Sequence, residues 1–156
     1  MPFEKFEGPF VDVDLLGCRN VFCGDRLILD LFEYQQSGPD EDMTLGGEKV
    51  TGVHIIGLTE SSRVWRITFD RPYAVRMRDL NLRHREPHKL DLPGRCCFSE
   101  NTEWTREFKV DDPHLGSFIL THYVFNSLDY LIEILANEAP TVEAIEGDAP
   151  GLETEG

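Results

Sequence analysis

The histidines and cysteines are the residues of this chain with the widest chemical range. His84 and His88 are four apart, a spacing that places two imidazoles on one face of a helix, as some zinc sites do. Cys96 and Cys97 follow closely enough to complete four ligands. However, Pro87 disfavours a helix there, and the spacing matches no zinc finger or metalloprotease motif. We predict that the histidines lie in an exposed loop and bind no metal. Metal binding by His84, His88, Cys96 and Cys97 stays open as an alternative.

Acid–base or nucleophilic catalysis needs a histidine, carboxylate or thiol held close to a second such group. The sequence contains no Gly-x-Ser-x-Gly elbow, kinase motif or phosphate-binding glycine loop that would place such a pair. His122 lies within an apolar run, where a lone histidine is more often a core group with satisfied hydrogen bonds. We therefore predict no catalytic residue and no cofactor. The groups that an enzymatic alternative would use are His54, His114 and His122 with Asp111, Asp112 or Cys96.

Two further patterns are structural in our interpretation. Asp12 and Asp14 are spaced as a metal pair, but the glycine and distal glutamate of a calcium loop are missing, which favours a solvent-facing strand. The N-terminus lacks a secretory signal, which predicts a cytoplasmic protein with reduced thiols rather than disulfides. Adjacent cysteines on a strand point to opposite faces, so we expect small buried side chains. The four cysteines are Cys18, Cys23, Cys96 and Cys97.

The clearest element signal runs from residue 63 to residue 79. Trp65, Ile67 and Phe69 alternate with polar residues, and Tyr73, Val75 and Met77 then alternate with arginines. Such alternation is typical of half-buried antiparallel strands. Because a proline cannot donate to a sheet ladder, the intervening segment 70–72 predicts a turn or strand edge. This stretch predicts architecture and indicates no chemistry.

Other segments extend the β pattern along the chain. Residues 26–35 predict a buried strand, and residues 118–125, apolar on both faces, predict a central one. Residues 50–58 predict a hairpin partner for the Trp65 strand, after an acidic loop at 36–48. Residues 96–110 predict one or two strands. The alternatives for residues 126–137 are a helix capped by Asn126 or Ser127 and a turn followed by a strand, which is favoured because the surroundings are β.

Length and pattern together predict the fold class. The 156 residues fit one domain that buries its own core. We expect a mainly β protein with a single antiparallel-sheet domain, a sandwich or roll, over residues 1–145. The alternative for 126–137 adds one short helix near 127–137, and residues 141–145 extend the sheet. Residues 146–156, rich in glycine and glutamate, predict a frayed acidic tail.

The charge is strongly acidic and unevenly distributed. The formal net charge is −14, yet residues 63–95 hold nine Lys or Arg against four Asp or Glu. After Lys109 there is no Lys or Arg and there are ten acids. Such a field repels nucleic acid and anionic membranes and attracts basic partners. No apolar run reaches the length of about 18 residues that a membrane span requires.

Three segments carry a resemblance to known proteins. They are the run Trp65–Asp79, the tetrapeptide His122–Phe125 and the run Ile132–Pro140. This pattern resembles that of small uncharacterised bacterial proteins, including some counted among polymorphic-toxin immunity proteins. The resemblance implies a single-domain, mainly β protein that binds another protein, and it brings no catalytic residues.

We expect from these observations a non-enzymatic protein-binding module with a basic protein partner. In the immunity hypothesis that partner is a toxin, neutralised in the cytoplasm of the producing bacterium. Nucleic acid and membrane are not expected as partners, and the sequence does not name the contact residues. Two alternatives stay open: a small enzyme with a His/Asp or His/Cys site, and a structural homo-oligomer formed through an open sheet edge.

Overall fold

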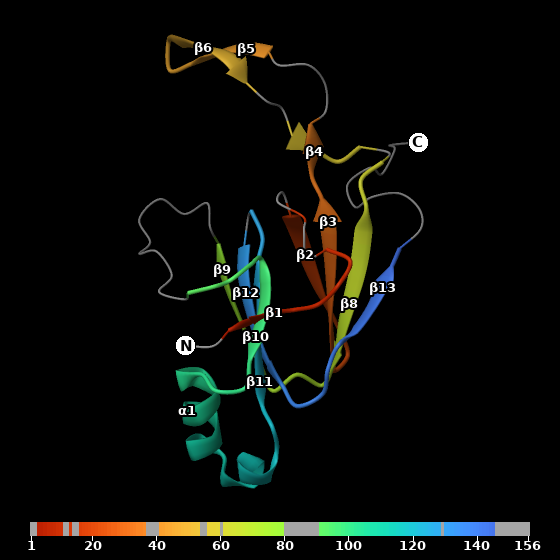
Figure 1. Ribbon diagram of the computed structural model, residues 1–156, viewed down its shortest axis with the longest axis vertical. Coiled ribbons are helices and arrows are strands. Elements are labelled where there is room, and N and C mark those ends of the chain that lie inside the picture. The colour runs from red at the N-terminus through yellow and green to blue at the C-terminus, as the bar shows by residue number, and fades with distance from the viewer. Residues whose placement is uncertain are drawn as a thin grey trace.

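The computed structural model is mainly β, as the sequence pattern predicts. Two antiparallel sheets pack face to face and share one hydrophobic core (Figure 1). The predicted tail at 146–156 lies outside the described residues. The structure describes residues 3–10, 13, 16–36, 41–53, 56–59, 61–79, 91–128 and 130–145.

The four-stranded sheet has the order β13-β8-β3-β2. Its central strands, β3 (Arg26–Glu33) and β8 (Val64–Asp70), are the predicted buried strand and the Trp65 strand. The edges are β2 (Leu16–Cys23) and β13 (Thr141–Ala144), the latter confirming that the segment after Pro140 extends the sheet. All of its pairings are antiparallel.

The five-stranded sheet has the order β1-β10-β11-β12-β9. Its central strand is β11 (Thr121–Asn126), within the segment predicted to be central. The turn and strand favoured for 126–137 are confirmed, because residues 131–136 of β12 (Tyr130–Ala136) pair with every residue of β11. The remaining strands are β1 (Glu4–Lys5), β10 (Cys96–Ser99) and β9 (Ala74–Asp79).

The core lies between the inner faces of the two sheets. On each strand alternate residues point inward, so Leu27, Leu29 and Leu31 of β3 pack with Phe69 of β8 against residues of the second sheet. The rings of Phe69 and Tyr123 lie 5.1 Å apart and bridge the sheets. At roughly 1.5–3 kcal/mol for each large apolar side chain fully removed from water, this layer is the main stabilising term.

The predicted turn at 70–72 separates strands of different sheets. Arg71 has a φ of 52°, and the chain passes there from β8 in the four-stranded sheet to β9 at the edge of the five-stranded sheet. Both strands of the segment 63–79 are therefore confirmed. The predicted hairpin between 50–58 and the Trp65 strand is wrong, because β8 pairs with β3 and β13.

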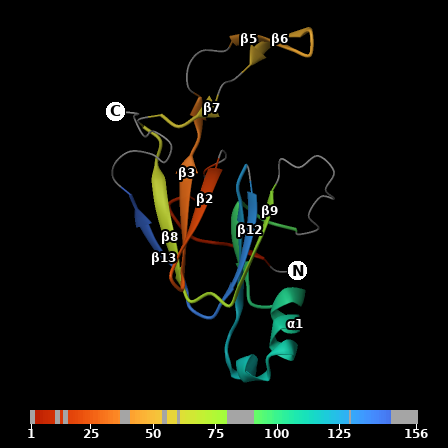
Figure 2. The same ribbon diagram turned by 180° about the vertical axis from the view of Figure 1, so that it is seen from behind.

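A long excursion leaves the sandwich between β3 and β8. The chain first forms β4 (Gln35–Gln36), which pairs with β7 (Ile56–Gly57). Beyond this short pairing, β5 (Glu41–Leu45) and β6 (Glu48–Val53) form a separate hairpin. Both views show the hairpin at one extremity of the molecule (Figures 1 and 2). A loop throughout 36–48 is therefore wrong, since Glu41–Leu45 is a strand.

The structure contains a short helix, but not near 127–137, where the alternative prediction placed one. It is α1 (Glu103–Asp111), followed by a 3-10 turn, η1 (Pro113–Ser117). The prediction of one or two strands over 96–110 is thus confirmed for β10 and wrong from residue 103 onward, where the chain forms α1. A reciprocal capping box between Thr102 and Thr105 starts the helix and satisfies two backbone N–H groups there. In the described part of the chain, no helix is long and apolar enough to cross a membrane.

Candidate functional site

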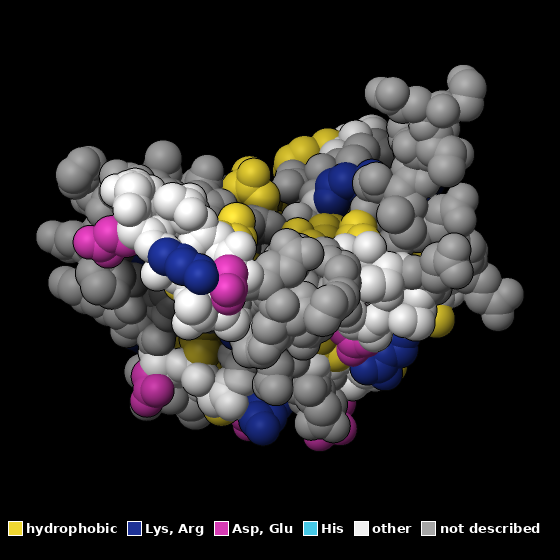
Figure 3. Space-filling model, turned by 90° about the horizontal axis from the view of Figure 1, so that it is seen from above, with side chains coloured by type: hydrophobic (Ala, Val, Ile, Leu, Met, Phe, Trp, Pro, Cys, Tyr) yellow, Lys and Arg dark blue, Asp and Glu magenta, His cyan; other side chains and the backbone are white. Residues whose placement is uncertain are grey.

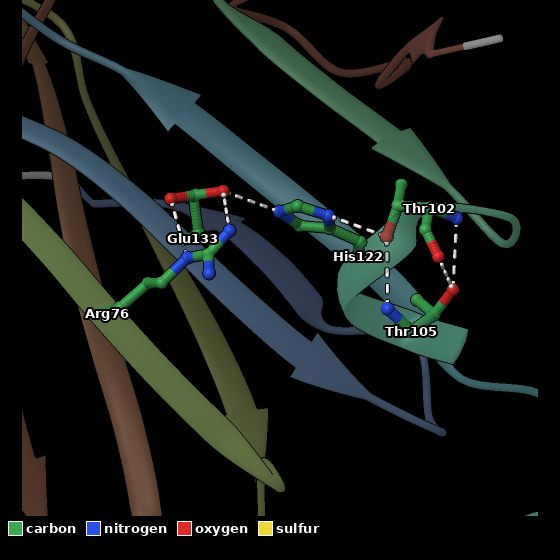
Figure 4. Close-up of polar contacts among 5 residues, drawn as sticks. All are labelled: Arg76, Thr102, Thr105, His122 and Glu133. Carbon is green, nitrogen blue, oxygen red and sulfur yellow. Dashed lines mark hydrogen bonds and ion pairs between the residues drawn. The ribbon is translucent and has the colours of Figure 1, made fainter. Parts of the chain in front are cut away.

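A polar network, buried except at Arg76, whose side chain is 51% exposed, lies on the outer face of the five-stranded sheet. Arg76 of β9, Glu133 of β12 and His122 of β11 come from three adjacent strands, and Thr102 precedes α1 (Figure 4). The register pairs Glu133 directly with Arg76 on one side and with Val124 on the other, and His122 lies two residues before Val124 along β11. The alternation of the strands therefore brings these side chains to one face, under the start of α1.

The hydrogen bonds run continuously from the sheet edge to the helix. Arg76 donates from Nε and Nη2 to the two Glu133 oxygens at 2.8 and 2.9 Å. His122 Nε2 lies 2.9 Å from Glu133 Oε1, and Nδ1 lies 3.0 Å from Thr102 Oγ1. Because an ionised carboxylate only accepts, Nε2 donates to it. In the neutral ring Nδ1 then accepts from the Thr102 hydroxyl.

Thr102 links this network to the backbone of α1. Its Oγ1 accepts the Thr105 N–H at 3.2 Å, and Thr105 Oγ1 accepts the Thr102 N–H at 3.0 Å. The first helical turn is thus capped by the same hydroxyl that contacts His122. The capped helix is thereby fixed to β11.

Aromatic rings enclose the network. The Trp104 ring lies under the Arg76 guanidinium at 3.9 Å and meets the edge of the His122 ring at 5.1 Å. Phe3 packs edge-on against the imidazole from another direction, with ring centroids 5.3 Å apart. Only 1% of His122 is exposed. The indole face of Trp104 attracts the Arg76 cation, and the exclusion of water around His122 strengthens the hydrogen bonds of its ring.

The electrostatics follow from this enclosure. Burial alone raises the pKa of the Glu133 carboxyl, but hydrogen bonds from His122 and Arg76 outweigh it and hold the pKa at about 2. Glu133 is therefore a buried carboxylate with three charge-assisted or polar donors. Such a group is stable only while its partners remain in place.

The order hydroxyl, imidazole, carboxylate is that of a hydrolase triad, but the accessibility differs. In a triad the hydroxyl is free to attack a substrate, whereas Thr102 is buried and its oxygen accepts a helix N–H. Both His122 ring nitrogens are engaged, as they are in a triad, so the difference lies in the buried hydroxyl. These hydrogen bonds hold the start of α1 against the five-stranded sheet.

The catalytic groups suggested by the sequence have different surroundings in the structure. The His122 ring nitrogens contact Glu133 and Thr102, and none of Asp111, Asp112 or Cys96. Asp112 caps η1 by accepting the N–H of His114, whose side chain is exposed. His54, His84 and His88 lie outside the described residues.

The cysteines divide between the two faces of β10, as expected for adjacent strand residues. Cys96 lies in the core between the sheets, and Cys97 packs with Phe3, Val124 and Leu131 on the outer face. These two sulfurs therefore cannot bind one ion together. Burial raises the pKa of both thiols, which disfavours thiolate chemistry.

The remaining metal candidates have the following positions. Cys18 is a buried thiol in β2, and the side chain of Cys23, like residues Asp12 and Asp14, lies outside what the structure describes. Among the described residues, no three His, Cys, Asp or Glu side chains gather as metal ligands would.

Sequence reasoning missed Glu133, Arg76 and Thr102 as members of one network. Two signals were present. Glu133 is the single charge within the apolar strand Tyr130–Ala136, and a buried charge requires a partner. The Thr102-x-x-Thr105 spacing also marks a capping motif. The identity of the partner strand depends on sheet order, which local pattern does not contain.

The arginines of the middle region form pairs with carboxylates on adjacent strands. Arg19 and Arg66 flank Asp30 across three strands, with Arg66 Nε 2.9 Å from Asp30 Oδ1. Arg76 pairs with Glu133 as described. Further pairs join Arg63 to Glu33 and Arg71 to Asp25. Four of the nine Lys and Arg of residues 63–95 are thus paired with carboxylates in the described part of the chain.

The exposed surface of α1 differs from these paired sheet faces. Glu103, Glu107 and Asp111 recur at helical spacing, are exposed, and form no ion pair with another described residue. Val110 lies among them with 79% of its surface exposed. At the opposite end of the molecule, basic side chains lie beside acidic ones (Figure 3), and Lys49 pairs there with Asp42. The α1 surface therefore combines unpaired acids with one apolar side chain and with Arg106, whose guanidinium donates to Asn101.

Comparisons with protein-family models, with curated proteins and with solved structures found no match for this chain. Class and function must therefore be argued from the fold and the surfaces described above.

Proposed function

We propose that this chain is a non-enzymatic protein-binding module whose partner is a basic protein. The observation that carries the proposal is the contrast between paired arginines and unpaired acids. Arg19, Arg66 and Arg76 are bound to carboxylates within the sheets, whereas Glu103 and Glu107 face solvent. Together with a net charge of −14, this leaves an outward field that attracts cations.

The finer form of the proposal is a bacterial immunity protein that neutralises a basic toxin in the cytoplasm. It is supported by the resemblance of the strand pattern and by the acidic charge. An inhibitor of this kind gains from rapid association, and complementary charge raises association rates at low salt. The interaction of His122 with Glu133 and Thr102 gives that histidine a structural role consistent with binding rather than catalysis.

The first test is capture of partners by the tagged chain from its native host at low and high salt. We expect one basic protein to bind at low salt and to be released as salt rises, because screening weakens charge attraction. Retention of only acidic or neutral proteins, indifferent to salt, would contradict the proposal.

The purified partner then allows a sharper measurement. Neutralising Glu103, Glu107 and Asp111 together, to Gln, Gln and Asn, is expected to slow association roughly 3- to 10-fold at low salt and hardly at high salt. The matched control replaces the exposed pair Asp25 and Arg71 by Asn and Gln, which leaves the net charge unchanged. Equal association rates for the two variants would remove the α1 surface from the proposal.

The immunity form has its own test. Expression of the partner alone should arrest growth of the host, and co-expression of this chain should restore growth. A basic partner that is harmless when expressed alone would retain the binding module and overturn the immunity form.

A further inference from the structure

We infer that the β5–β6 hairpin is the docking arm of this chain, and that Met43 and Val50 anchor it in an apolar slot of the basic partner. The inference rests on the proposed function: the acidic field of the whole molecule, to which the α1 acids contribute, attracts the partner, and the arm is the surface that the partner contacts. It concerns the end of the molecule opposite α1 (Figure 1).

The hairpin is a regular structure with a fixed register. Gly46 and Gly47 have φ values of 60° and 85°, as a type I′ turn requires at both central positions, and this turn matches the twist of paired strands. Next to the turn, Leu45 pairs with Glu48. Gly52, with a φ of 68°, donates its N–H to Asp42 near the base of the hairpin. The turn and the pairing thus determine which residues share a face.

Met43 and Val50 lie on one face of the hairpin together with the exposed Glu48, and the other face is polar. Met43 and Val50 are directly opposite each other, and each is 39% exposed. Thr44 and Lys49 are likewise opposite each other, and Lys49 contacts Asp42 at 3.6 Å. Antiparallel strands with such alternation normally cover a core with their apolar face.

No such core lies beneath Met43 and Val50 in the described part of the chain. Neither side chain belongs to any of the three hydrophobic clusters. An isolated two-stranded hairpin is only marginally stable in water. A paired, exposed methionine and valine on a projecting arm are therefore suited to insertion into another molecule, since methionine adapts its shape to irregular slots.

The charge around the arm favours a basic protein as the occupant. The hairpin sequence 41–53 contains Glu41, Asp42 and Glu48 with Lys49 as its single basic residue, and Lys49 is already paired with Asp42. A second copy of the chain would bring two molecules of net charge −14 together, and an anionic lipid surface would repel the arm. An apolar slot with a basic rim matches both the anchors and the acids.

The test uses the full chain and the purified basic partner. The variant Met43→Thr with Val50→Thr removes both anchors and introduces β-branched residues that suit a strand. The control variant, Thr44→Ser with Thr51→Ser, alters neither anchor. We expect the first variant to bind about 10- to 100-fold more weakly, mainly through faster dissociation, and the control to bind as the parent does.

The salt dependence separates this inference from the proposed function. If the double change Met43→Thr, Val50→Thr leaves affinity intact while salt still releases the partner, the arm is not the docking element and the inference fails alone. If no salt-releasable basic partner exists, both fail. Hydrogen exchange of the parent complex adds a second readout, because arm amides should become protected on binding.

Two further outcomes would assign the arm to another occupant. Sedimentation of the chain alone would overturn the inference if it showed a dimer that dissociates in the Met43→Thr, Val50→Thr variant. Binding of the parent, but not of this variant, to phosphatidylcholine or phosphatidylserine vesicles would overturn it in favour of a lipid surface.

Discussion

Glu133 illustrates how a single buried charge organises its surroundings. It interrupts an apolar strand, and burying an unpaired carboxylate would cost several kcal/mol. Arg76 and His122 offset that cost with hydrogen bonds, and Trp104 covers the guanidinium. Removing any one of these groups leaves the others incompletely paired, so the network acts as a unit.

We predict that Glu133 makes stability depend on acid. Its folded-state pKa of about 2 lies below the ordinary 4.5, so its stabilisation is fully present above about pH 4.5 and is lost as pH falls towards 2. That contribution amounts to about 3 kcal/mol. Urea unfolding from pH 2 to 7 should show a weaker fall in Glu133→Gln, although this variant is less stable at pH 7.

The control for this experiment is Glu107→Gln on the exposed surface of α1, which should keep the parent's pH dependence. Asp30, whose pKa is also lowered because Arg66 and Arg19 outweigh its burial, leaves some acid sensitivity in every variant. An identical slope for Glu133→Gln and the parent would refute the assignment.

At the scale of elements, α1 depends on one threonine at its start. Thr102 caps the helix and contacts His122, so its hydroxyl serves both the element and the network. Helices of this length are marginal by themselves in water and draw stability from their contacts.

We predict that Thr102→Ala lowers the free energy of unfolding by about 2 kcal/mol, roughly half from the lost cap and half from the lost His122 hydrogen bond. Thr102→Ser should retain most of the stability because it keeps the hydroxyl. Urea unfolding followed by tryptophan fluorescence measures both. Equal losses for the two variants would indicate that packing of the methyl group, rather than the hydroxyl, fixes the helix.

The elements also show what local pattern can and cannot predict. The strands β3, β8, β9 and β11 have clear alternation or apolar runs, and their existence was predicted correctly. The helix α1 was missed because Trp104, Phe108 and Val110 are spaced two or four apart, which suits a strand as well. The β5–β6 hairpin was missed because its acids and glycines resemble a loop.

At the scale of the whole molecule, the two sheets depend on one shared core. Trp65 lies inside that core and Trp104 lies on the far side of the five-stranded sheet, so each reports a different layer. The net charge is also a property of the whole molecule, and its acidic sign was predictable from composition. The pairing of His122 with Glu133 was not, because it depends on which strands become neighbours.

We predict that the sandwich unfolds in one cooperative transition, as single domains of this size usually do. In Trp65→Phe and in Trp104→Phe, urea midpoints from the remaining tryptophan and from far-UV circular dichroism should coincide. A Trp104 transition at lower urea than the circular dichroism transition would contradict this prediction and indicate that α1 detaches first.

The excursion between β3 and β8 begins and ends at adjacent positions of one ladder, where the Glu33 N–H donates to the carbonyl of Arg63. The two strands would remain neighbours if the intervening segment were short, long or different in sequence, since closing a longer loop adds only about 0.6 kcal/mol per doubling. The arm can therefore diversify, or be exchanged between related chains, without rebuilding the sandwich. In the binding role inferred for the arm, recognition and folding are thereby free to change at separate rates.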